Sequence, residues 1–116
     1  MHLKLIIALV SDEKTAAVTD AARTAGATGA TTITSARGEG LTPEKTFMGL
    51  DLSGQRDILL FIVAGERSRS ILEAIAVAGQ FEEEPGSGMA FELNIDDAVG
   101  MGTQMPTMLE EVEAEV

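Results

Sequence analysis

The chain has 116 residues, 45% of them hydrophobic, and a mean hydropathy of +0.16, values typical of a single folded domain. Its 8 Lys and Arg against 19 Asp and Glu give a formal charge of −11, which repels nucleic acids and anionic lipids and predicts neither as a partner. Cysteine is absent, the opening run LKLIIALV is too short for a signal peptide, and no apolar run is long enough to cross a membrane, so we expect a cytoplasmic protein.

The first part of the chain predicts a strand, a helix and a second strand. Leu3–Val10 is almost continuously aliphatic, which is typical of a strand buried on both faces. Ser11 is placed to cap the helix that follows, and Gly26 is placed to end it. The β-branched run within Thr31–Arg37 then favours a strand.

The stretch Ala36–Arg56 has neither a strand period nor a helix period and contains the pair Gly38-x-Gly40. Connections this long inside a compact domain are usually functional or disordered. An apolar cluster within it favours the first alternative, because a fully solvated loop would lack one. We therefore predict that this loop docks either on the body of its own chain or on a partner protein, and we expect Lys45, Phe47 and Met48 to make the contact with a partner.

The second part of the chain repeats the pattern of strand, helix and strand. Asp57–Ala64 is apolar on both faces, and an apolar stripe at helical spacing follows it and ends at Gly79. An acidic turn, Phe81–Pro85, leads through Gly86-Ser87-Gly88 into Met89–Ile95, where apolar and other side chains alternate as on a half-exposed strand.

This order predicts an α+β, ferredoxin-like βαββαβ fold, with a four-stranded antiparallel sheet and two helices on one face. Two helices cannot cover both faces of such a sheet, although two of its strands are apolar on both. We therefore expect copies of the chain to pack their open sheet faces together in a closed oligomer. Residues 103–116 form an acidic tail, and the capping-box spacing from Thr107 to Glu110 allows a short helix there.

The residues that carry catalysis or bind metals are few. His2 is the single histidine and lies at the chain start, where we expect it to be solvated. The acidic groups Glu82–Glu84 and Asp96–Asp97 are predicted to be solvated turns rather than metal ligands. We predict no metal and no enzyme; a phosphate-ester hydrolase depending on Arg37 is the catalytic alternative.

Three segments, GATGATTITSARGEG, ILLFIVAG and PGSGMAFELNIDDAV, resemble the nitrogen-regulatory PII signalling proteins, and the divergent PII-like members most closely. The resemblance implies a homotrimer with adenine nucleotides bound in clefts between subunits. It implies a PII-like domain over residues 1–102, with Gly38–Arg56 as the T-loop, Phe81–Gly88 as the B-loop and a C-loop from Asp97 onward.

The resemblance also implies which residues line the nucleotide site: Thr31, Arg37, Gly38, Gly40, Ile62, Gly86, Ser87, Gly88 and Met89. Three cations of the family's site are replaced, because Met89, Gly100 and Gly102 stand at those positions. Each lost charge-assisted contact is worth about 1.5–3 kcal/mol, which favours AMP or ADP over ATP. Arg37, Lys45 and Arg56 are the loop cations that could substitute, and otherwise we expect them to be ordinary surface residues.

The sequence thus predicts a non-enzymatic regulator that senses a small ligand, most simply an adenine nucleotide, and acts on a partner protein through its loop. The resemblance implies a membrane transporter as one class of partner. The chain has no tyrosine, so the nucleotidyl modification of a T-loop tyrosine seen in some relatives is excluded. The alternative is an interaction module that kept the trimer and binds no ligand.

Overall fold

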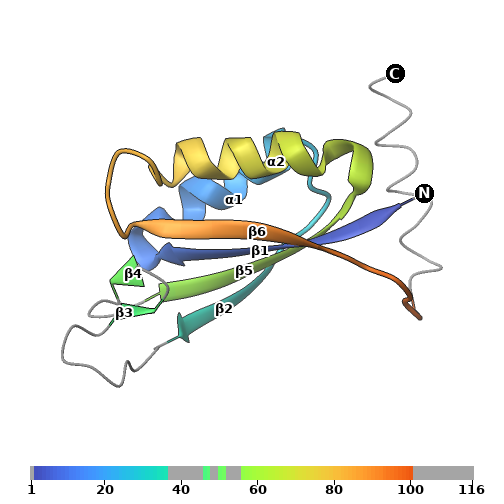
Figure 1. The fold of residues 1–116 in the computed structure, drawn as a ribbon, viewed down its shortest axis with the longest axis horizontal. Helices are drawn as coiled ribbons and strands as arrows, with labels where there is room; N and C mark the ends of the chain where they lie inside the picture. Colours follow the sequence, from blue (N-terminus) through green and yellow to red (C-terminus); the bar gives the residue numbers. More distant parts are fainter. Residues whose placement is uncertain (1, 37–45, 48–49, 52–55, 101–116) are drawn as a thin grey trace.

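The computed structural model describes residues 2–36, 46–47, 50–51 and 56–100, which form a sheet with two helices on one face (Figure 1). The elements follow the chain as β1 (Leu3–Ser11), α1 (Thr15–Thr24), β2 (Thr31–Ala36), β3 (Thr46–Phe47), β4 (Leu50–Asp51), β5 (Arg56–Ala64), α2 (Gly65–Ala78) and β6 (Gly88–Asn94). The four long strands lie in the order β2-β5-β1-β6, and every pair is antiparallel. The predicted α+β ferredoxin-like βαββαβ fold is confirmed.

The register of β1 with its neighbours decides which side chains share a face. Ile6 lies opposite Phe61 of β5, and the next residue, Ile7, lies opposite Leu60 of β5 and Phe91 of β6. Because successive side chains of a strand point to opposite faces, Ile6 and Phe61 face the helices while Ile7, Leu60 and Phe91 face away from them.

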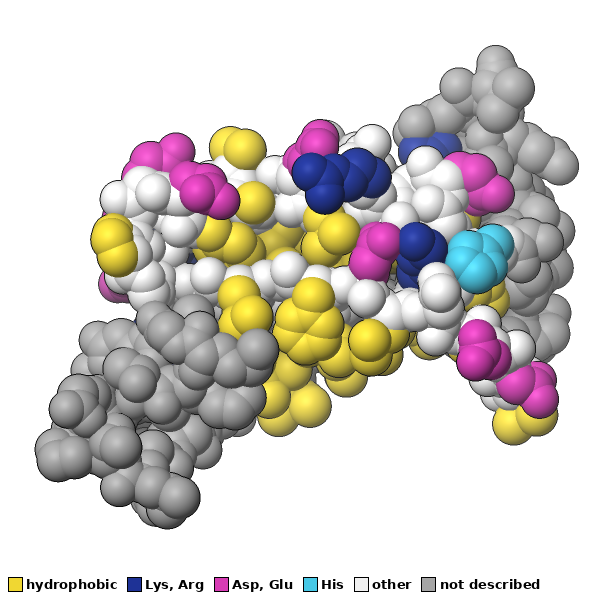
Figure 2. All heavy atoms as spheres, viewed as in Figure 1, with side chains coloured by type: hydrophobic (Ala, Val, Ile, Leu, Met, Phe, Trp, Pro, Cys, Tyr) yellow, Lys and Arg dark blue, Asp and Glu magenta, His cyan; other side chains and the backbone are white. Residues whose placement is uncertain are grey.

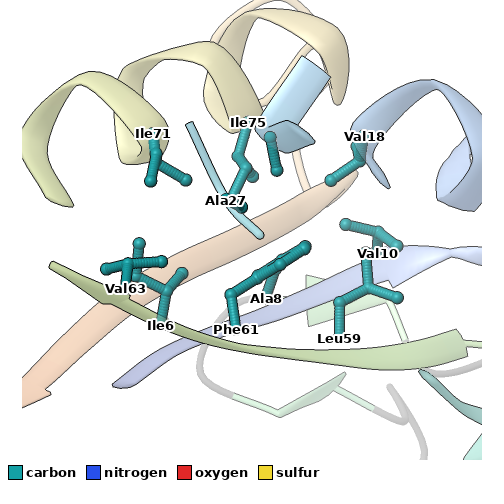
Figure 3. Close-up of a cluster of buried hydrophobic side chains, with 11 residues drawn as sticks. Ile6, Ala8, Val10, Val18, Ala27, Leu59, Phe61, Val63, Ile71 and Ile75 are labelled. Atoms are coloured by element: carbon teal, nitrogen blue, oxygen red, sulfur yellow. The ribbon is translucent and has the colours of Figure 1, made fainter. Parts of the chain in front are cut away.

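The hydrophobic core fills the layer between the sheet and the helices (Figure 3). Its largest members are almost inaccessible to solvent: Ile6, Val10, Leu59, Phe61, Val63, Val18, Ile71 and Ile75. They come from the middle strands β1 and β5 and from one stripe of each helix. This explains every second apolar residue of β1 and β5, because the residues between them face the other side of the sheet.

The other face of the sheet, which we call the open face, is also apolar, and no described segment of the chain covers it. It carries Leu5, Ile7, Leu9, Ile58, Leu60 and Met89, which are partly exposed, and Ile33, Ile62, Phe91 and Leu93, which are exposed. Figure 2 shows hydrophobic side chains gathered below the sheet, on the side away from the helices. The prediction that the first strand is buried on both faces therefore holds for one face only in the isolated chain.

Of the two residues predicted to begin and end the first helix, the one at its end is confirmed and the one at its start is wrong. Gly26 does follow the helix, at a φ of +122° that favours glycine. Ser11, however, makes no capping hydrogen bond with its side chain. A short 3-10 turn, Asp12–Lys14, separates it from α1, so the α-helix begins at Thr15 instead.

The loop between β2 and β5 contains the short antiparallel pair of β3 and β4, which the sequence did not indicate. Residues 37–45, 48–49 and 52–55 lie outside the described residues, as does the tail after residue 100, so the prediction of a tail helix stays a prediction. Within the described ranges, no helix combines the length and the apolar character needed to cross a membrane.

Candidate ligand-binding site

One cavity lies at the start of β2, on the open face of the sheet. Its volume is about 360 Å³, and its lining residues are Leu5, Thr28, Gly29, Ala30, Thr31, Leu60 and Ile62. Apolar side chains from β1 and β5 form one wall, and the backbone of the segment leading into β2 forms the other. Small-molecule sites are typically cavities of roughly this size with an apolar lining and a few polar groups. This cavity unites two residues predicted for the site, Thr31 and Ile62.

The turn Gly86–Gly88, here called the glycine turn, lies between α2 and β6 at the other end of the sheet (Figure 1). Gly86 has a φ of +76°, in the left-handed region that glycine adopts at little cost. At Gly88, a Cβ atom would lie 2.7 Å from the backbone oxygen of Leu9 and closer still to a ring carbon of Phe81. Both glycines are therefore required by the fold itself, whether or not a ligand binds there.

Arg56, the first residue of β5, holds the glycine turn in place. Its Nη1 donates a hydrogen bond to the carbonyl of Ser87 at 2.7 Å, and its Nη2 donates to the carbonyl of Gly86 at 2.9 Å. Its exposed fraction is 8%. The expectation that Arg56 is an ordinary surface residue is therefore wrong, because its guanidinium is enclosed and bound to the backbone.

Lys14, which directly precedes α1, binds the first part of the segment that joins α2 to β6. Its ammonium donates to the carbonyl of Gly79 at 3.2 Å, to Oε1 of Gln80 at 2.7 Å and to Oε2 of Glu84 at 2.7 Å. The hydroxyl of Ser87 donates to the carbonyl of Gln80 at 3.0 Å. The predicted acidic turn is thus partly neutralised at Glu84, while Glu82 and Glu83 are exposed as expected.

An acid–hydroxyl pair, formed by Asp57 and Thr15, lies next to Arg56. Asp57 is buried on the helix side of β5 and accepts a hydrogen bond from the hydroxyl of Thr15 at 2.5 Å. The hydroxyl of Ser11 is buried too, and it has no hydrogen-bond partner among the described residues. This end of the sheet is therefore rich in polar groups, whereas the cavity at the start of β2 has aliphatic side chains along one wall.

An ion pair joins β1 and β6 far from the glycine turn. Nζ of Lys4 lies 2.8 Å from Oε1 of Glu92. Hydrogen bonds from Lys4 and then Ser68 hold the pKa of Glu92 below its ordinary value, and burial opposes them only in part. Because Lys4 and Glu92 lie on the helix side of the sheet, this pair supports the fold rather than the site.

The described residues put the predicted site in two separate places. Thr31 and Ile62 line the cavity, whereas Gly86, Ser87, Gly88 and Met89 lie at the start of β6. The cavity extends over β2, β5 and β1, whereas the glycine turn lies at the β6 edge near the other end of β1, where Gly88 pairs with Val10. Among the described residues, the cavity and the glycine turn are therefore separate places.

The loop residues of the prediction are not placed by the structure. Arg37, Gly38, Gly40, Lys45 and Met48 lie outside the described residues. Phe47 belongs to β3 through its backbone. Within the parts of the chain that are described, no three His, Asp or Glu side chains lie close enough to hold a metal ion.

Sequence reasoning missed some residues of these places. Leu5 lines the cavity but belongs to no motif of the sequence, and Thr28–Ala30 lie in the segment GATGATTITSARGEG without having been predicted as site residues. Arg56 stood out only as a loop cation. Its position directly before a buried strand could have indicated that it is buried, since a segment that packs on the end of that strand would also enclose the arginine.

The family model for nitrogen regulatory protein P-II matches residues 3–105. A crystal structure of a candidate PII-like signalling protein from Thermus thermophilus is similar, with a TM-score of 0.59 and 24% identity over 82% of this chain and 88% of that chain. At this identity the similarity supports the fold alone. None of the curated proteins matches the sequence. The family match spans nearly all of the chain, and the chain therefore belongs to the nitrogen regulatory protein P-II family.

Proposed function

We propose that the protein is a non-enzymatic regulator: a homotrimer that binds an adenine nucleotide between subunits and acts on a partner protein through the loop 38–56. Members of the family are regulatory proteins of this kind, and the family match supports regulation as the general role. The trimer, the ligand and the loop partner are the parts that we propose.

The observation that carries the proposal is the separation of the two half-sites. The cavity with Thr31 and Ile62 lies on the open face near one end of the sheet, and the glycine turn lies at the β6 edge near the other end. A second copy packed on the open face would cover exposed Ile33, Phe91 and Leu93. The same packing would place the glycine turn of one chain beside the cavity of another, which makes the site complete only in the assembly.

The residues present fit a nucleotide with few phosphates. The cavity offers apolar walls from Leu60 and Ile62 and the hydroxyl of Thr31, a combination suited to a purine base. The glycine turn lets a ligand approach the backbone closely, but Met89 adds no charge there. We therefore propose AMP or ADP as the better ligand, and ATP as a weaker one.

The test is calorimetric titration of the full-length chain with AMP, ADP and ATP, with and without magnesium. We expect AMP and ADP to bind in the micromolar range and ATP to bind more weakly. If none of the three nucleotides binds below millimolar concentration, the nucleotide part of the proposal is wrong.

A ligand-independent interaction module on the same trimer is the second candidate. Two observations favour it: three family cations are replaced at Met89, Gly100 and Gly102, and both glycines of the turn have structural reasons to be glycine. Limited proteolysis of the loop separates the candidates. A regulator should change its loop cleavage rate when ADP is added, whereas a module should not.

A further inference from the structure

We propose that Arg56 is a positioning residue of the ligand site, which sets the orientation of the glycine turn for the anionic part of the ligand. The inference rests on the proposed function, since it assigns a role at the proposed site. It goes beyond the sequence prediction, which gave Arg56 only as a loop cation that could substitute for a lost one.

The geometry of the two hydrogen bonds carries the inference. Arg56 presents a rigid planar fork, and it donates to two successive carbonyls, those of Gly86 and Ser87, at 2.9 and 2.7 Å. A peptide group is planar and trans, so fixing a carbonyl also fixes the direction of the N–H in the same group. Arg56 thereby sets both peptide groups of the turn, including the one that ends at Gly88.

The turn needs such a support because its own sequence is flexible. Gly86 and Gly88 have no side chains, and Gly86 occupies the left-handed region. The amide of Ser87 donates to the carbonyl of Glu84 at 3.0 Å, which anchors the N-terminal side of the turn. Arg56 anchors the carbonyl side, and it does so from the residue where the predicted loop ends and β5 begins. The turn and the root of the loop are thus joined by one side chain.

Lys14 offers a matched control for Arg56, because it donates hydrogen bonds to another part of the segment between α2 and β6. It is also a cation that donates to this loop, but its partners are Gly79, Gln80 and Glu84 rather than the carbonyls of the turn. Replacing Arg56 or Lys14 by Gln removes one positive charge in each case. The two variants differ in which part of the loop loses its support.

The first experiment needs no ligand. Hydrogen exchange is measured on the full-length protein, on Arg56→Gln and on Lys14→Gln. We expect Arg56→Gln to raise exchange in peptides covering residues 86–88 by about tenfold, and Lys14→Gln to raise it at residues 79–84 instead. Arg56→Lys keeps the charge but lacks the planar fork, so its exchange at residues 86–88 should lie between that of Arg56→Gln and that of the natural protein. If Arg56→Gln does not fold, Arg56→Lys takes its place in the experiment.

The second experiment separates positioning from a merely structural role. ADP and adenosine are titrated into the natural protein and into the same variants. We expect Arg56→Gln to weaken ADP about tenfold while changing adenosine less than twofold, since adenosine lacks the phosphates that the turn would meet.

Three results overturn the inference: unchanged exchange at residues 86–88, an unchanged ADP affinity, or an equal loss of ADP and adenosine affinity in Arg56→Gln. If the natural protein binds no ADP at all, the proposed nucleotide function fails instead. The exchange experiment then still decides whether Arg56 positions the turn.

Discussion

The two faces of the sheet are built from the same strands and differ in what covers them. On the helix side, Ile6, Leu59 and Phe61 are almost fully enclosed. On the open face the side chains are equally apolar, yet Leu93 is 49% exposed and Ile33 is 47% exposed. Exposed apolar patches of this extent usually mark an interaction surface. The contrast supports the proposal that other copies of the chain cover the open face.

The largest effect should come from breaking the covered face. Phe61→Ala removes the largest fully buried side chain and leaves a cavity that the strands cannot close, which should lower the free energy of unfolding by about 3–5 kcal/mol. Thermal or denaturant unfolding measures it. Val77→Ala, at an exposed position of α2, is the control and should change stability by less than about 0.5 kcal/mol. A loss below about 1 kcal/mol for Phe61→Ala would contradict this account of the core.

The next effect should come from placing a charge on the open face. Leu60→Asp would bury an unpaired carboxylate if copies pack there, at a cost of several kcal/mol to assembly. We expect the variant to lose the concentration dependence of Tm that an oligomer shows. Thr32→Asp, on the opposite face of the neighbouring strand, is the control and should keep it. Equal behaviour of the two variants would mean that the open face is not the interface.

A smaller loss of stability is expected from a substitution in the glycine turn, which forms part of the proposed site. Gly88→Ala places a methyl group against the backbone oxygen of Leu9 and the ring of Phe81, and the resulting overpacking should cost about 1–3 kcal/mol. A Cβ atom at Gly29 would have no other atom within 4 Å, so Gly29→Ala should leave the free energy of unfolding unchanged or raise it by up to about 1 kcal/mol. The two unfolding curves are compared directly. Similar stabilities would show that the turn can shift freely, against the close packing described.

The smallest effect concerns the ion pair on the covered face. Because the pKa of Glu92 is lowered by Lys4 and Ser68, its ionised form stabilises the fold above the ordinary pKa of about 4.5, and this contribution is lost as the pH falls through the lowered value. Glu92→Gln should therefore cost up to about 1 kcal/mol at pH 7 and much less in acid. Glu73→Gln, in the exposed pair with Arg69, should cost less. A difference between the natural protein and Glu92→Gln that does not shrink in acid would contradict the assignment.

Much of the fold follows from local pattern. The alternation in Met89–Ile95 predicted which side chains of β6 share a face, and Gly26 marked the helix end because its backbone angle suits glycine. The capping role of Ser11 was wrong, since a 3-10 turn intervenes before α1. A single sequence gives no sign of such a turn, because it depends on how α1 must sit on the sheet.

The candidate site was less predictable than the fold. Thr31 and Ile62 share a cavity, but the glycine turn lies on the far edge, and sequence order alone does not show that separation. The role of Arg56 could not be read from its residue type, because an arginine in a loop is most often solvated. Its partners are backbone carbonyls of a segment 30 residues away, which only the folded chain brings near.

The central claim is that other copies of this chain cover the open face, and the mass of the protein in solution tests it most directly. Light scattering at micromolar concentration should give about three times the chain mass of 12.2 kDa. A particle with the mass of one chain, with its open face in contact with water, would contradict the account.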